Sequence, residues 1–493
     1  MRPRSSWKSR RAPSAGHLAV WPIACATGWT WRMPIGRISS RRRRPSSNVP
    51  GCGPICGPAG WKALPAIRIS PAFSALRPMN GAPDGATAAS GRFSSSASPR
   101  TSRMRRRACP SQRRSRNSPP ISPAMRISAM RHETIIAKSR NVEGFDGLSK
   151  EIAAAVGGAD DRDAFPAEGF DVLRKRGLCS RPPIGKGEGR SLLRLLAAVG
   201  QGDLGLGRLY EGHVNALDLV RRFGPPEIVR KVHALAEAGG LFGVWNTDQP
   251  GDPLTSRDGR LTGRKNFASG VDGLSHAIVT APVPDGRQMF IVGLDAVAVD
   301  RSWWRPLGMT ASGSHVVDFA PVPAEAITPL GVPGDYIAEP WFTGGAIRFS
   351  AVHVGGMRAV AQAAVDHLQA SGRSGNPHQA HRLGRMGLAL ETGRLWLESA
   401  ADAWDAAETA VGADPDGARL RAVANGFRTV VEQLAMEVLE TAERAVGAAG
   451  FNAPHPLERL IPDLRTYLRQ PNPDGALTGF ADAFLAGEMA AGR

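Results

Sequence analysis

The chain has 493 residues, enough for about two to four domains, and a formal net charge of +18. The charge is uneven, because residues 1–130 hold 24 of the 62 Lys and Arg residues and only one of the 44 acidic residues. That segment carries about +23 and the remainder about −5, so the net charge does not indicate a nucleic-acid partner for the rest of the chain.

Residues 1–129 are dense in Arg, Ser, Pro and Gly, and they show no sustained hydrophobic period of 2 or 3.6 residues. Runs such as RRRRPSSNVP cannot bury a core. Four interpretations remain: a transit peptide, a secretory signal, an arginine-rich arm that binds nucleic acid, or an extension translated upstream of the true start. We favour the last, with Met130 as the start, and expect residues 1–129 to be either a disordered tail or an assignment error.

From Met130 onward the sequence is that of an ordinary globular protein. Cys179 is its one cysteine, which excludes an internal disulfide framework and a zinc site built on cysteines. No apolar run reaches the roughly 18–20 residues that span a bilayer. We therefore expect a cytoplasmic protein with no membrane association and no metal.

Three regions follow one another in this part of the chain. Residues 130–240 contain helical patterns, for example GPPEIVRKVHALAEAGG, which starts after paired prolines and ends in paired glycines. Residues 241–335 contain short β-type runs, with a turn expected at PDGR, 284–287. Residues 336–493 return to long helices, and GADPDG joins two of them.

The two long helices expected at 384–407 and 418–445 each carry one apolar stripe with alternating steps of three and four residues. Helices with a single stripe pack against each other, so these two should lie antiparallel in a bundle. Their side faces also leave apolar residues available for a contact between subunits. The sequence thus predicts an α+β fold, mostly α, with an N-terminal helical domain, a small middle β-domain and a C-terminal four-helix bundle.

This order of domains and three motifs resemble the acyl-CoA dehydrogenase superfamily. The motifs are GRLTGRKNFASGVDGLSHAIVTA, RPLGMTASGSHVVDFAPVPAEAITPLG and LERLIPDLR, and the resemblance covers roughly residues 165–490. It implies FAD as cofactor, with reduced FMN as the alternative, and a small-molecule substrate such as an acyl thioester. It also implies a homodimer or homotetramer, and it leaves a nucleic-acid partner unlikely.

The resemblance places the flavin at the segment around Phe267 and at a second segment around Thr247. Phe267 would stand behind the flavin ring, and Ser269 with the backbone of Ala268 would contact its polar edge. In VWNTDQPGDPL, Trp245 and Thr247 would lie at the flavin, Thr247 near the reactive nitrogen. A flat ring and nearby hydrogen-bond donors suit a flavin. The alternatives are that Phe267 is a core ring before a strand and that the second segment is a plain turn.

Five further residues follow from the resemblance. Arg373 and Gln379 would bind the flavin phosphates from a neighbouring subunit, although their spacing is shorter than the family pattern. Ser312 and Ser314 would line the substrate pocket or bind a phosphate, and His213 would line the substrate cavity. Each also has a structural interpretation, as a solvated helix end, a turn residue or a buried histidine.

The catalytic base is not identified by the sequence. Dehydrogenases of this type remove an α-proton with a Glu, but the loop after Arg465, TYLRQPNPDGAL, contains no Glu. Its one acid, Asp474, lies in a turn, and Glu391 and Glu398 on an earlier helix belong to no motif. The segment is also similar to the flavin monooxygenase branch of the superfamily, which needs no such base but often has a His here.

Three hypotheses therefore stand after the sequence. The first is an FAD-dependent oxidoreductase that acts on a CH–CH bond of an acyl thioester or an analogue. The second is a monooxygenase of the same fold that uses reduced flavin and oxygen. The third is a degenerate member of the superfamily without catalysis.

Overall fold

The computed structural model describes residues 145–489, apart from 146, 159–160 and 410–416. The predictions for residues 1–129 and for a start at Met130 lie outside these residues. The described chain begins with the helices α2 (Leu148–Gly157), α3 (Ala167–Lys175), α4 (Gly189–Gly202), α5 (Leu204–Phe223) and α6 (Pro226–Glu237). Local sequence sets two helix starts: the Asp203 side chain accepts a hydrogen bond from the Leu206 amide, and Pro226 is the first residue of α6.

The middle region forms a compact set of short strands. They are β1 (Phe242–Trp245), β2 (Thr255–Arg257), β3 (Arg260–Thr262), β4 (Arg264–Ala268), β5 (His276–Val283), β6 (Gly286–Gly293), β7 (Ala298–Asp300), β8 (His315–Asp318) and β9 (Ile327–Leu330). One sheet has the order β1-β5-β6-β9, a second β4-β8-β7, and β2 pairs with β3. The β5–β6 hairpin turns at the predicted Pro-Asp-Gly, where Gly286 has a φ of 139° that favours glycine.

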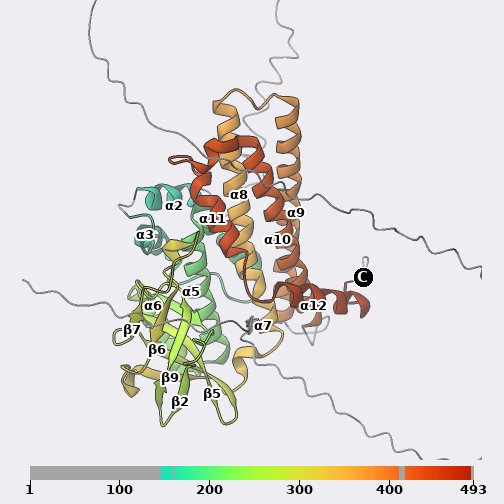
Figure 1. Ribbon diagram of the computed structural model, residues 1–493. Coiled ribbons are helices and arrows are strands. Elements are labelled where there is room, and N and C mark those ends of the chain that lie inside the picture. Colours follow the sequence, from blue (N-terminus) through green and yellow to red (C-terminus); the bar gives the residue numbers. More distant parts are fainter. Residues whose placement is uncertain (1–144, 146, 159–160, 410–416, 490–493) are drawn as a thin grey trace, which may run out of the picture. The chain divides into compact units, whose positions relative to one another are not determined.

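The remaining chain is helical. After the short α7 (Trp341–Gly344), the long helices α8 (Ala346–Ala370), α9 (Pro377–Thr409) and α10 (Ala418–Val446) lie side by side in Figure 1, followed by α11 (Leu457–Tyr467) and α12 (Pro473–Leu485). Most members of the predicted stripes are buried, for instance Leu397, Trp404 and Phe427. The mostly helical structure, with its small β-domain and C-terminal bundle, confirms the predicted fold class.

One carboxylate joins three parts of this fold. Asp463 on α11 accepts a hydrogen bond from the Met309 amide in the loop between β7 and β8, at 2.5 Å. Arg459, one turn earlier, pairs with Asp463 and with Asp203, the residue that caps α5. A side chain on Gly308 would collide with the Pro462 backbone, so the loop and α11 touch directly. The motifs around Gly308 and Asp463 therefore meet in space.

Two general findings concern the described residues alone. None of their helices is long and apolar enough to cross a membrane. They contain no group of three or more His, Cys, Asp or Glu side chains arranged to hold a metal ion.

Candidate functional site

Phe267 is the most unusual residue of the β-domain. It lies near the end of β4, at a shift in the register with β8, and its φ of 51° is in the left-handed region. Its side chain is 49% exposed, and the ring packs edge-on against Trp303 at 4.9 Å and against Trp304 at 6.1 Å between centroids. A large ring held open to solvent in a strained backbone conformation is typical of a binding site.

The other residues predicted for the flavin lie next to Phe267. The Trp245 indole at the end of β1 donates a hydrogen bond to the Ser269 carbonyl at 3.1 Å. The Asn266 amide donates to the Thr247 carbonyl, also at 3.1 Å, and the Thr247 side chain is exposed. The structure thus brings Trp245, Thr247, Phe267, Ala268 and Ser269 together on adjacent segments.

A buried lysine fixes the segment that carries Thr247. Lys265 on β4 is fully buried, and its Nζ donates to the Asp248 carboxylate at 2.6 Å and to the Asn246 carbonyl at 2.9 Å. Arg287 binds the other oxygen of Asp248 at 2.7 Å. Burial lowers the pKa of Lys265 to about 8, while the hydrogen bond to Asp248 favours its charged form. Lys265 lies within the predicted motif, but the sequence did not indicate this role.

The two predicted serines form a hydroxyl chain with Ser269. Ser314 Oγ lies 2.8 Å from Ser269 Oγ and 2.9 Å from Ser312 Oγ, and all three side chains are buried. The Gly270 amide also donates to the Ser312 carbonyl. Ser312 and Ser314 therefore hold the loop of Ser269 in place, and their hydroxyls are engaged with one another.

The structure gives His213 a structural position. Its Nδ1 accepts a hydrogen bond from the Phe242 amide at 3.1 Å, so the proton lies on Nε2, which donates to the Cys179 carbonyl at 2.7 Å. The ring is fully buried, and burial lowers its pKa to about 4. Both nitrogens are used by the backbone, which leaves none to face the substrate cavity that the sequence suggested.

Arg373 and Gln379 make their contacts within the helical bundle. Arg373 follows α8, whose 25 residues extend about 37 Å at 1.5 Å per residue. Its guanidinium contacts the Ser371 hydroxyl and the His367 ring, and Gln379 is buried with its amide donating to the Ala445 carbonyl. Within one chain the structure does not bring these two residues to Phe267.

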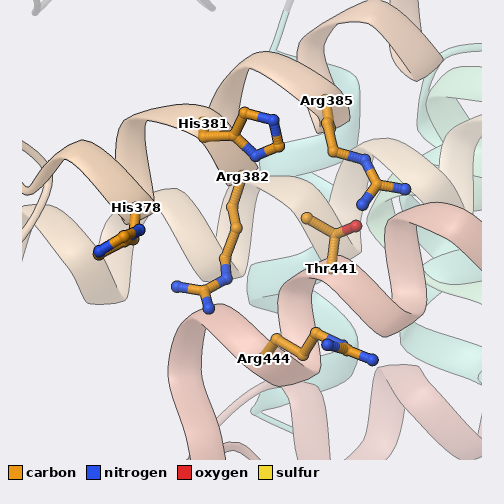
Figure 2. Close-up of a pocket in the computed structure, with 6 residues that line it drawn as sticks. All are labelled: His378, His381, Arg382, Arg385, Thr441 and Arg444. Carbon is orange, nitrogen blue, oxygen red and sulfur yellow. The ribbon is translucent and has the colours of Figure 1, made fainter.

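A basic pocket of about 220 Å³ lies beside Gln379. Figure 2 shows its lining, which comes from α9 and α10: His378, His381, Arg382, Arg385, Thr441 and Arg444. Arg382 donates to the Gln379 side chain at 3.2 Å, Arg385 pairs with Glu437, and Arg444 pairs with Glu440. Three guanidinium groups around one hollow suit a phosphate group. The sequence indicated Gln379 but not this cluster.

The acids considered as catalytic bases are placed elsewhere. Asp474 is exposed in the first turn of α12. Glu391 pairs with Arg394 on the surface, and Glu398 pairs with Arg190 and Arg194. The segment after Arg465 instead buries Tyr467, which the sequence did not indicate because it is not a carboxylate.

The comparisons with known proteins agree with this architecture. The family described as acyl-CoA dehydrogenase, C-terminal domain, matches residues 334–468. The chain is 25% identical over 379 residues to the putative acyl-CoA dehydrogenase YdbM of Bacillus subtilis, covering 68% of this chain and 94% of that protein. It is 27% identical over 355 residues to L-evernosamine nitrososynthase of a Micromonospora species, covering 65% and 83%.

A solved structure with the same fold is TdsC from Paenibacillus sp. A11-2, a dibenzothiophene monooxygenase, in complex with FMN and indole. It superposes with a TM-score of 0.59 and 20% identity, covering 69% of this chain and 95% of that chain. This likeness concerns the fold.

Proposed function

Because the chain is a divergent member of the acyl-CoA dehydrogenase superfamily, we propose that it is a flavin-dependent monooxygenase acting on a small molecule. The observation that carries the proposal is the open ring of Phe267, flanked by the Ser269 hydroxyl chain. FMN, the cofactor in the TdsC complex, is the flavin we propose first, with FAD as the alternative.

The residues present fit a flavin. The exposed face of Phe267 would pack against the ring system, and the exposed hydroxyl of Thr247 and the Ser269 loop would meet its polar edge. The Ser312 and Ser314 hydroxyls and the Lys265–Asp248 pair hold these segments in position before the flavin binds. When bound, the flavin supplies the hydride or oxygen chemistry.

The phosphate of the flavin would bind in the basic pocket of a second copy of the chain. Arg382 and Arg444 offer charge-assisted hydrogen bonds there, and Gln379 supports Arg382. Because the described contacts of Arg373 and Gln379 are with the bundle and not with the Phe267 loop, the proposal places the pocket and the loop on different copies of the chain, at least a homodimer. Arg373 would then contribute from the adjoining turn.

Oxygenation is the preferred reaction because it needs no base to remove an α-proton. Among the described residues, the acids considered for that task are exposed or paired with arginines. A second candidate is dehydrogenation of a CH–CH bond in an acyl thioester, favoured by the likeness to YdbM and by the C-terminal domain match. It would require a proton acceptor other than Glu391, Glu398 or Asp474.

The first test is a titration of the purified chain with FMN, FAD and riboflavin, followed by visible absorption and ring fluorescence. We expect FMN to bind more tightly than riboflavin, since only FMN has a phosphate. Protein with FMN should then oxygenate a heteroaromatic or amine substrate when a flavin reductase is supplied. Anaerobic bleaching of the bound flavin by octanoyl-CoA would instead support the dehydrogenase. Failure to bind any flavin would contradict both and leave a member without catalysis.

A further inference from the structure

Two polar atoms are buried without a partner at the end of α11. The Tyr467 hydroxyl and Nε2 of His353 on α8 have no hydrogen-bond partner among the described residues, and each side chain is 3% exposed. Their rings pack edge to face, with centroids 4.5 Å apart. A buried polar group without a partner costs about 1–3 kcal/mol, so such a pair needs an explanation.

The two atoms have complementary hydrogen-bonding roles. Burial, together with the charges of Arg428 and Arg469, lowers the pKa of His353 to about 3, so the ring is neutral. A hydrogen bond with the Tyr467 backbone raises that pKa, which means that the ring donates this bond. Its unpaired Nε2 is therefore an acceptor. Burial raises the pKa of Tyr467, so its hydroxyl stays protonated and can donate.

The pair is linked to the loop of Phe267 through α5. The charges of Arg208 and Glu211 act on the Tyr467 hydroxyl, in opposite directions. Arg208 also lines a crevice of about 10 Å³, room for about one water molecule, together with Trp245 and Ser269. Tyr467 and the residues assigned above to the flavin edge are thus both neighbours of Arg208.

Arg208 shares its acidic partner in the described chain with a second arginine. Glu211 is shared between Arg208 and Arg348, with one carboxylate oxygen 3.3 Å from each. Arg348 has further partners in Asn215 and Asp218, whereas Arg208 has Glu211 as its one recorded partner in the described chain. A polar environment of this kind favours a molecule with hydrogen-bonding atoms over a saturated acyl chain.

From this geometry we propose that Tyr467 and His353 form the binding site for the polar group of the substrate. The Tyr467 hydroxyl donates to a heteroatom of the bound molecule, and His353 Nε2 accepts from its O–H or N–H. The proposal rests on the proposed function and deepens it, because it makes the substrate a small molecule with a hydroxyl, amine or ring N–H. Tyr467 is then a substrate-binding residue at the position where the sequence offered no acid.

The test uses phenol and toluene as probes. The two molecules have nearly the same size, but only phenol can donate and accept a hydrogen bond. Calorimetric titration of the wild-type protein, with and without FMN, should show phenol binding at least tenfold more tightly than toluene. Tyr467→Phe should abolish this difference. Tyr210→Phe is the matched control, since that buried hydroxyl donates to the Leu178 carbonyl at 2.9 Å and lies in the structural core.

Thermal unfolding separates binding from a structural role. Tyr467→Phe removes an unpaired hydroxyl and should not lower Tm, whereas Tyr210→Phe should lower it by several degrees. A Tm loss in Tyr467→Phe equal to that of the control, or equal binding of phenol and toluene by the wild type, would overturn the proposal. If the wild-type protein failed to bind FMN but still bound phenol more tightly than toluene, the result would count against the proposed function and not against this site.

Discussion

At the scale of single residues, Phe267 has two opposed effects. Its left-handed φ costs about 1–2 kcal/mol for a residue other than glycine, while its open ring is available to a ligand. Backbone strain that does not help the protein to fold is expected where a residue is retained because it binds a ligand.

Phe267→Gly should therefore raise the free energy of unfolding by about 1 kcal/mol and weaken FMN binding about tenfold, because the strain and the packing surface are lost together. Urea unfolding and flavin titration measure the two effects. Phe342→Ala is the control: that ring is also about half exposed but packs on Tyr336, away from the loop. If Phe267→Gly were destabilising with unchanged FMN affinity, Phe267 would be a core ring.

His213 predicts a dependence of stability on pH. Its pKa is lowered to about 4 in the folded protein, against an ordinary value near 6.5, so between these values the unfolded chain binds more protons. Stability should fall as the pH falls from about 6.5 to about 4, by on the order of 3 kcal/mol from this residue. His353 acts in the same direction. Urea unfolding at several pH values should show a smaller loss for His213→Gln, and curves parallel to the wild type would contradict the assignment.

The sequence could predict some of these residues and not others. Phe267 stands out in the chain as a lone ring among small residues, but its place at a flavin came from the family resemblance and stays a prediction. His213 is set by the Phe242 amide and the Cys179 carbonyl, which come from distant segments, so the sequence could not distinguish a buried structural histidine from a pocket residue. Tyr467 was missed because an unpaired hydroxyl is a property of the folded interior.

At the scale of elements, α4 and α8 approach so closely that a side chain is excluded between them. A Cβ on Gly355 would collide with the Ala197 carbonyl and lie 2.6 Å from the Gln201 nitrogen. The backbones of α4 and α8 can lie this close together only because residue 355 is a glycine.

Gly355→Ala should therefore lower the free energy of unfolding by about 1–3 kcal/mol, since the helices must separate. The same substitution at Gly384, in the interior of α9 with open space around it, should raise it by up to about 1 kcal/mol through helix propensity. Chemical unfolding of both variants tests the pair. Equal changes in the two variants would mean that helix propensity, and not the contact between α4 and α8, sets the effect on stability.

Elements with a strong period were the predictable ones. The helix expected at 418–445 is α10, and the hairpin around Pro-Asp-Gly is present, because stripes and turn residues are local signals. The three-residue strands β2, β3 and β7 were not expected. They are too short for a hydrophobic alternation: β2 and β3 pair with each other around Asp258-Gly259, and β7 pairs with β8 across the long loop that carries Met309.

At the scale of the whole molecule, the basic pocket provides a test of the proposed assembly. Substituting Arg382 and Arg444 together with Ala should weaken FMN binding by tenfold or more, because two charge-assisted bonds to the phosphate are lost, and should leave riboflavin binding unchanged. Fluorescence titration gives both affinities. Arg394→Ala, which removes a surface arginine paired with Glu391, is the control. Equal losses for FMN and riboflavin would place the phosphate elsewhere.

The junction at Asp463 has a consequence for how the protein melts. One carboxylate binds the β-domain loop at Met309, and through Arg459 it reaches the cap of α5, so this contact and the Phe242–His213 hydrogen bond both tie the sheet region to the helices. Loss of the Asp463 carboxylate leaves the Met309 amide and Arg459 without this shared partner. The described part of the chain should therefore unfold cooperatively, as one calorimetric transition with equal calorimetric and van't Hoff enthalpies. In Asp463→Ala the coupling between the sheet and the bundle should weaken, and the van't Hoff enthalpy should fall below the calorimetric enthalpy as the heat-absorption peak broadens.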